Sequence, residues 1–150
     1  RVFEIPNSYW ITGAVTAMLT VVCVLLHYEG LRVLSDMLPK PKHHDRRRMI
    51  LLILSLLALH VVEIWIFGFA YFTLLQDPAF GSIEGLEALT LVDSVYYSAM
   101  VFTTVGFGDL YPTGAVRVMT AMEGITGLTM ITWSASYTFV EMSKVWNERK

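Results

Sequence analysis

The sequence Thr103-Thr104-Val105-Gly106-Phe107-Gly108-Asp109 lies between two apolar stretches of the chain and decides the fold. Glycine stands at alternate positions, Gly106 and Gly108, and glycine adopts backbone conformations that other L-residues avoid. This alternation lets successive backbone carbonyls face one axis, while Val105 and Phe107 point outward and hold the strand. Residues 103–109, which we call the filter segment, are therefore predicted to present a row of carbonyl oxygens.

A row of carbonyl oxygens suits a dehydrated cation. A potassium ion that sheds its hydration shell needs fixed oxygen dipoles in exchange, and rings of backbone carbonyls supply them. Thr104 adds a hydroxyl at the inner mouth, and Asp109 adds a ring of negative charge at the outer mouth that concentrates cations. One chain offers a quarter of such a ring, so we expect a homotetramer around a central pore.

The composition places this segment in a membrane. Of 150 residues, 55% are hydrophobic and only 16% are charged, which is too apolar for an ordinary soluble domain. A bilayer crossing needs about 20 mostly apolar residues, and three stretches are long enough: Tyr9 to Tyr28, Met49 to about Leu75, and about Thr113 to Phe139. Asn7-Ser8 before the first stretch are residue types that cap helix N-termini. We expect an all-α membrane protein with three transmembrane helices.

A basic cluster between the first two stretches predicts the orientation. Five of the eleven Lys and Arg residues fall between residues 40 and 48, and such residues are enriched in cytoplasmic loops. We therefore expect the N-terminus outside the cell membrane, the C-terminus in the cytoplasm and residues 76–112 on the outer side. The cluster is also a candidate site for anionic lipid headgroups; its members are Lys40, Lys42, Arg46, Arg47 and Arg48.

A short helix is expected just before the filter segment. Thr90 and Asp93 have the spacing of a capping box, and the helix should run to about Phe102. Its length of about 13 residues is too short to span a bilayer, so we expect a re-entrant helix whose C-terminal dipole favours a cation at the centre. Asp77-Pro78, Gly81 and Gly85 indicate an irregular outer loop before it.

These features resemble the potassium channel family over roughly Met49 to Trp146, and Leu110-Tyr111-Pro112 continues the motif as in some bacterial members. The resemblance implies a two-helix pore module at residues 49–150, preceded at 1–48 by an additional membrane helix and the basic linker. It also implies that K⁺ is coordinated by Thr104, Val105, Gly106 and Phe107. No cofactor beyond permeant K⁺ and no nucleic-acid partner is expected.

The filter support departs from many relatives. They have Tyr where this chain has Phe107, and pore-helix positions often held by tryptophan are here Tyr96 and Tyr97. Met100 stands where some bacterial channels have a carboxylate. The residues expected to support the filter and form the outer mouth are Thr103, Gly108, Asp109, Tyr96, Tyr97 and Met100.

The third stretch carries the candidate gating residues. Gly127 and Gly124 are candidate hinges because glycine weakens a helix interior, although both could instead permit close helix packing. The family pattern implies that the lower pore, a candidate for closure by dewetting, is lined by Leu128, Ile131, Ala135 and Phe139.

Three ionisable residues are expected within the membrane. His60 and Glu63 share a helical face, and Glu123 should lie behind the short helix, near Tyr or Ser hydroxyls there or near His60. Such residues are costly in a bilayer and are functional candidates. Either they form a structural hydrogen-bond network, or they sense protons.

The sequence favours a potassium-selective channel subunit. The alternatives are a weakly selective cation channel and a non-conducting regulatory subunit. No enzyme is expected, because no nucleophile and base pair at a readable spacing. For His43-His44, a solvated loop is preferred over a metal site.

Overall fold

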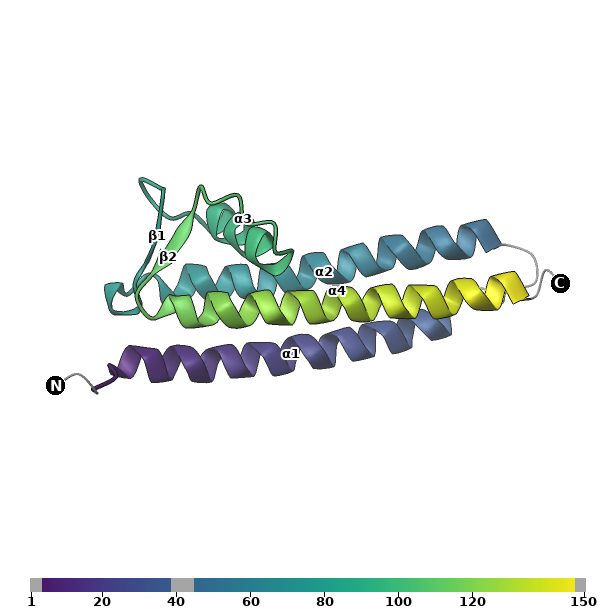
Figure 1. Cartoon of the computed structure of the whole chain (residues 1–150), viewed down its shortest axis with the longest axis horizontal. Helices are drawn as coiled ribbons and strands as arrows, with labels where there is room; N and C mark the ends of the chain where they lie inside the picture. The colour runs from purple at the N-terminus through teal and green to yellow at the C-terminus, as the bar shows by residue number, and fades with distance from the viewer. Residues whose placement is uncertain (1–3, 39–44, 148–150) are drawn as a thin grey trace.

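The computed structural model describes residues 4–38 and 45–147. Three long helices, α1 (Asn7–Met37), α2 (Asp45–Leu74) and α4 (Val116–Asn147), lie alongside one another, with α2 running opposite to the other two (Figure 1). Among the described residues, α1 and α2 are long and apolar enough to cross a membrane. The third expected crossing is present as the 32-residue helix α4, which is more polar, so its place in the membrane stays a prediction.

The helix ends differ from the predicted ones. Asn7 is already helical and Pro6 is the N-cap, without a side-chain cap, so the prediction that Asn7-Ser8 cap this helix was wrong. The backbone N–H of Tyr9 instead bonds to the carbonyl of Pro6 at 3.0 Å. Helix α4 continues past the predicted Phe139 to Asn147. The bundle is therefore longer than the apolar stretches alone indicated.

The short helix α3 (Leu91–Phe102) lies at one end of the bundle, packed against α2 and α4 (Figure 1). Its predicted capping box is confirmed: the Asp93 backbone N–H donates to the Thr90 hydroxyl at 3.1 Å, and the Thr90 N–H donates to the Asp93 carboxylate at 3.2 Å. Gly68 of α2 allows the close approach, since a Cβ there would lie 2.8 Å from the Val95 Cα.

The segment before α3 is more ordered than the predicted irregular loop. After the 3₁₀ turn η1 (Pro78–Phe80), strand β1 (Ser82–Glu84) pairs antiparallel with β2 (Tyr111–Thr113), with Ser82 opposite Thr113. Because β2 follows the filter segment, this pairing fastens the filter's outer end to the chain preceding α3. Strands of three residues carry too little periodicity to be read from sequence.

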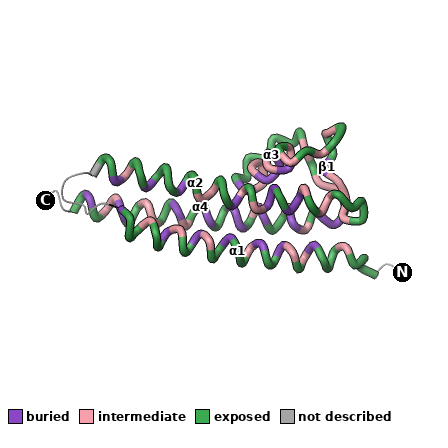
Figure 2. The backbone as a smooth tube through the Cα atoms, turned by 180° about the vertical axis from the view of Figure 1, so that it is seen from behind, coloured by how far each residue is buried: buried purple, intermediate pink, exposed green. Residues whose placement is uncertain are grey.

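A buried stripe of mostly small or polar side chains joins α1 to the rest of the bundle. Figure 2 shows buried positions recurring along the helix at helical spacing, and the Thr20 and Thr126 hydroxyls lie 3.4 Å apart across the α1–α4 contact. Small and polar residues let membrane helices approach closely and bond to one another. The buried residues of α1 are Thr12, Thr16, Leu19, Cys23, His27 and Leu31.

Gly127 is a packing residue in this structure. A Cβ at Gly127 would overlap the Phe102 carbonyl at the end of α3, whereas a Cβ at Gly124 meets only the Val101 carbonyl oxygen, at 3.9 Å. Of the two candidate hinges, Gly127 is therefore the one that permits close helix packing. Helix α4 is continuous through both positions, and a hinge at either stays a prediction.

These two glycines form a matched pair for testing. Gly127→Ala should destabilise the protein by about 1–3 kcal/mol, because the added methyl group forces α3 and α4 apart. Gly124→Ala should leave stability unchanged or raise it by up to about 1 kcal/mol, since alanine favours helix and space is available. Thermal unfolding of the detergent-solubilised variants measures both, and equal effects would contradict the packing role.

Candidate functional site

The filter segment leaves α3 with the alternating backbone that its sequence predicted. Thr104, Gly106 and Gly108 have positive φ angles of 60°, 51° and 81°. Thr104 is the one residue other than glycine with a positive φ among the described residues. That conformation costs a threonine about 1–3 kcal/mol and is typical of functional sites. Because Thr104, Gly106 and Gly108 are every second residue, positive φ angles alternate along the backbone from residue 104 to 108.

The inner end of the filter segment is tied to the C-terminus of α3. The Thr104 N–H donates to the Val101 carbonyl at 3.0 Å, and the Gly106 N–H donates to the Met100 carbonyl at 3.1 Å. The Thr103 hydroxyl donates to the Ala99 carbonyl at 2.6 Å. Carbonyls that a helix end leaves unpaired are thus used to hold the backbone that follows.

The outer end is held by a side chain of α3. The Tyr96 hydroxyl donates to the Asp109 carboxylate at 2.8 Å, and this hydrogen bond raises the pKa of Tyr96. The structure thus brings two of the residues predicted to support the filter and form the outer mouth, Tyr96 and Asp109, into contact. The hydrogen bond holds the Asp109 carboxylate, which is the candidate cation-concentrating charge, at the outer end of the filter segment.

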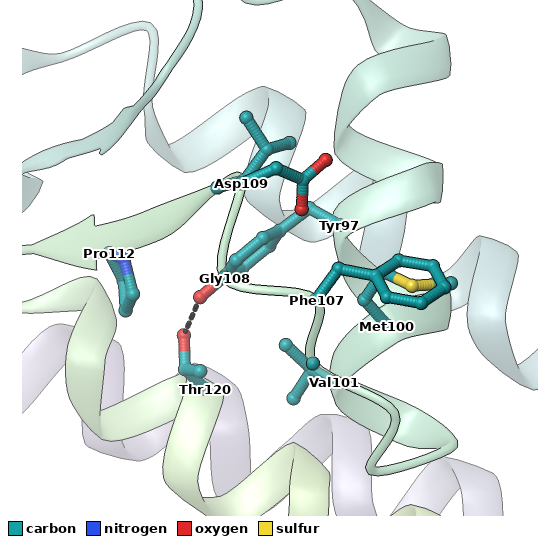
Figure 3. A pocket seen from close by; sticks show the side chains of 10 residues that line it. Tyr97, Met100, Val101, Phe107, Gly108, Asp109, Pro112 and Thr120 are labelled. Carbon is teal, nitrogen blue, oxygen red and sulfur yellow. Dashed lines mark hydrogen bonds between the residues drawn. The ribbon is translucent and has the colours of Figure 1, made fainter.

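A cavity of about 190 Å³ lies between α3, the filter segment and α4 (Figure 3). Met100 and Phe107 both line it, yet the Phe107 side chain is 72% exposed and Val105 is 53% exposed. Tyr97 is buried and its hydroxyl lies 2.9 Å from that of Thr120 on α4 (Figure 3). Tyr97 thus braces α3 against α4, and Val105 and Phe107 are not covered within one chain.

The fully buried Glu123 carboxylate joins three helices. It accepts hydrogen bonds from Tyr71 of α2 at 2.6 Å and from Ser98 of α3 at 2.5 Å. The predicted contact with a serine hydroxyl of α3 is confirmed, whereas the tyrosine belongs to α2. Sequence reasoning missed Tyr71 because nothing local to it indicates a partner on α4.

His60 and Glu63 belong to a second cluster, so the predicted network with Glu123 divides into two. Glu63 is fully buried, with its oxygens 2.8 Å from Nδ1 of His27 and 2.9 Å from Nδ1 of His60. Ser134 Oγ of α4 lies 3.2 Å from Nε2 of His27. Sequence reasoning missed His27 because no Asp, Glu, Lys or Arg of the first apolar stretch accompanies it. Its spacing of four residues from Cys23 indicates that the two side chains share one face of the helix, and this face is buried.

The opposite end of the bundle is joined by charged residues. Arg48 of α2 is buried and forms an ion pair with the buried Glu141 of α4, which Lys144 also contacts at 2.6 Å. Arg48 therefore contacts another helix, while Arg46 and Arg47 are exposed. The remaining members of the proposed lipid-binding cluster, Lys40 and Lys42, lie outside the described residues.

The four predicted lower-pore residues occupy different surroundings on α4. Leu128 is 53% exposed and Phe139 is 66% exposed, and Ala135 is also exposed. Ile131 is partly buried against the core of the chain. Three of the four therefore face away from their own chain and are open to contact with other molecules or solvent.

A bundle of long apolar helices, with a short helix and a segment of alternating positive φ angles at one end, is consistent with an ion channel. A family model described as "Ion channel" matches residues 59–144. This is more than half of the chain, so the chain belongs to this ion channel family. No curated protein and no solved structure matched the chain significantly. The matched region takes in α3, the filter segment and most of α4, and α1 lies outside it.

Glu123 offers a direct test of the brace behind the filter segment. Glu123→Leu should lower the thermal unfolding midpoint, because each buried hydroxyl left without an acceptor costs about 1–3 kcal/mol. Glu123→Gln retains one acceptor oxygen and should lower the thermal unfolding midpoint by less. Glu87→Leu, which changes an exposed carboxylate, is the matched control. An unchanged midpoint in Glu123→Leu would contradict the bracing role.

Proposed function

We propose that the chain is one subunit of a homotetrameric channel that conducts K⁺ passively and selectively. The observation that carries this proposal is the alternation of positive φ angles at Thr104, Gly106 and Gly108, in a segment bonded to the end of α3 at one side and to Tyr96 at the other. Such a backbone can turn successive carbonyls toward one axis. Thr104, Val105, Gly106 and Phe107 are the proposed K⁺ ligands.

The electrostatic setting favours a cation at the inner end of the filter segment. The C-terminus of α3 carries the negative end of its helix dipole, and it leads directly into Thr103. The Asp109 carboxylate stands at the other end of the segment. A permeating ion would therefore meet negative potential at both ends, and neutral carbonyl oxygens between them would replace its water.

Four copies around an axis account for the surfaces left open in one chain. Val105 and Phe107 are exposed apolar side chains in a segment whose predicted role is to hold the filter strand. Exposed apolar patches of this kind mark contacts with other molecules. We propose that neighbouring subunits cover them and that the axis passes along the opposite, carbonyl side of the filter segment.

The arrangement of the helices supports the proposed topology. The N-terminus lies at the same end of the bundle as α3 and β1–β2, and the C-terminus lies at the other (Figure 1). We propose that α1, α2 and α4 cross the cell membrane with the filter segment and N-terminus outside. Arg46 and Arg47, with Lys40 and Lys42, would then meet anionic lipid headgroups at the cytoplasmic surface.

Two alternatives rest on specific features. A weakly selective cation channel is favoured by Phe107, because a side chain without a hydroxyl cannot anchor the filter by a hydrogen bond. A non-conducting regulatory subunit is favoured by α1, which lies outside the family match and offers a helix for partners. Neither alternative accounts for the conformation of Thr104 as directly as a selective filter does.

Ion selectivity separates the leading proposal from both alternatives. In liposomes under bi-ionic K⁺/Na⁺ conditions, we expect the reversal potential to shift by about 59 mV for each tenfold preference for K⁺.

Gly106→Ala should abolish K⁺ flux, because alanine strains the positive φ at that position. Gly13→Ala, on α1 where an added Cβ meets nothing within 4 Å, is the control. A shift near zero would favour the weakly selective channel, and no flux from purified tetramers would favour the regulatory subunit.

The proposed gate makes a separate prediction. If the exposed apolar side chains of Leu128, Ala135 and Phe139 face the pore below the filter, the closed state can exclude water there. Phe139→Asn should then raise the open probability in single-channel recordings by favouring hydration. Val140→Asn, at the next residue of α4, which is also exposed at 50%, is the control. Unchanged gating in Phe139→Asn would count against the dewetting gate.

A further inference from the structure

Outside the filter segment, the ligating side chains of two helices converge at one buried point. His27 of α1 meets His60 and Glu63 of α2, with one potential ligand atom from each within 4.8 Å of the others. We propose that these three residues form a binding site for a divalent transition-metal ion, Zn²⁺ being the best-suited occupant. The ion would fasten α1 to α2 beside α4.

The geometry is close to that of a metal centre. Ligand atoms of one tetrahedral zinc ion lie about 3.4 Å apart. The two histidine nitrogens now lie 2.8 Å and 2.9 Å from oxygens of the same carboxylate, and no pair in the cluster exceeds 4.8 Å. Shifts of about 1 Å or less at each side chain would therefore admit the ion. The imidazole ring centroids lie 5.4 Å apart, with the ring planes inclined by 27°.

The type and orientation of the donors also fit. Two imidazoles and a carboxylate are ligands that Zn²⁺ accepts in proteins. Both histidines point Nδ1 toward Glu63, which leaves Nε2 of His27 facing Ser134 at 3.2 Å. Metal-bound histidines usually donate their second ring N–H to an oxygen atom, which fixes the tautomer and ring orientation. Ser134 of α4 is placed to be that oxygen acceptor.

The charge of the cluster leaves room for a cation. Glu63 is fully buried, and a buried carboxylate is costly unless it is paired or coordinates a metal ion. A divalent ion supplies positive charge and three bonds at once. His60 remains 15% exposed at its side chain, while His27 and Glu63 are fully buried. The cluster is therefore closed on the sides of His27 and Glu63 and only partly open at His60.

The site would couple the additional helix to the pore module. His27 lies on α1, outside the family match, whereas its partners lie within the matched residues 59–144. Ser134 directly precedes Ala135, one of the predicted lower-pore residues, on α4. A bound ion would thus hold α1 in place and, through Ser134, restrain the half of α4 that follows Gly127.

The test measures metal binding and does not depend on ion conduction. The full chain is purified with His43→Gln and His44→Gln in every sample, which removes the neighbouring histidine pair as a competing site. Zn²⁺ titration should then show one saturable site per chain. His27→Gln and Glu63→Gln should weaken binding by at least about 100-fold, and Ser134→Ala by about tenfold. Asp36→Asn, at an exposed residue, should bind like the parent.

Two further readouts keep the test decisive if a cluster variant fails to fold. Zn²⁺ should raise the thermal midpoint of the parent, because a ligand that binds only the folded state stabilises it. Co²⁺ should give the parent the intense visible absorption of a tetrahedral site, and Zn²⁺ should remove that absorption. No saturable binding to the parent, or equal affinity in a folded His27→Gln variant, would overturn the proposal and leave a hydrogen-bonded or proton-binding cluster.

Discussion

The arrangement of the channel module depends on the hydrogen bonds that one buried carboxylate accepts. Glu123 lies on α4 and binds Tyr71 of α2 and Ser98 of α3. Helix α3 has only 12 residues and packs against α2 and α4, so such contacts with the long helices fix its position. A carboxylate in this setting is costly when its hydrogen bonds are unmet, so the three helices are held to one relative position. The filter segment inherits that position from α3.

The filter segment is then constrained at both of its ends. Its first residues bond to the last carbonyls of α3, and after Asp109 the chain enters β2, which pairs with β1. Between these fixed points the backbone forms neither helix nor sheet, and Thr104 has a positive φ angle, which is unfavourable for threonine. Non-helical backbone is tolerated at membrane depth where protein or a water-filled path surrounds it. The exposed side chains of Val105 and Phe107 are consistent with a surrounding formed partly by other subunits.

Local chemistry could be predicted from the sequence, and contacts between distant segments could not. The capping box of Thr90 and Asp93, the end of α3 at Phe102 and the backbone at Gly106 each follow from neighbouring residues, and all agree with the structure. The pairing of β1 with β2, the packing of Gly127 on Phe102 and the meeting of His27 with Glu63 join segments far apart in sequence. No pattern within one helix shows which of its faces meets a particular neighbour. The positions of K⁺, the lipids and the other subunits remain predictions for the same reason, because each depends on molecules beyond one chain.

If four copies of the filter segment surround a row of K⁺ ions, ion density should be visible on their common axis in an assembled structure. Crystals of the purified protein grown in K⁺ and then exchanged into Tl⁺, whose anomalous scattering locates it, would show where permeant ions bind. We predict four subunits around one axis, with ions on that axis between the carbonyls of Thr104, Val105, Gly106 and Phe107. Filter segments that do not meet at an axis, or an axis without ions at these carbonyls, would contradict it.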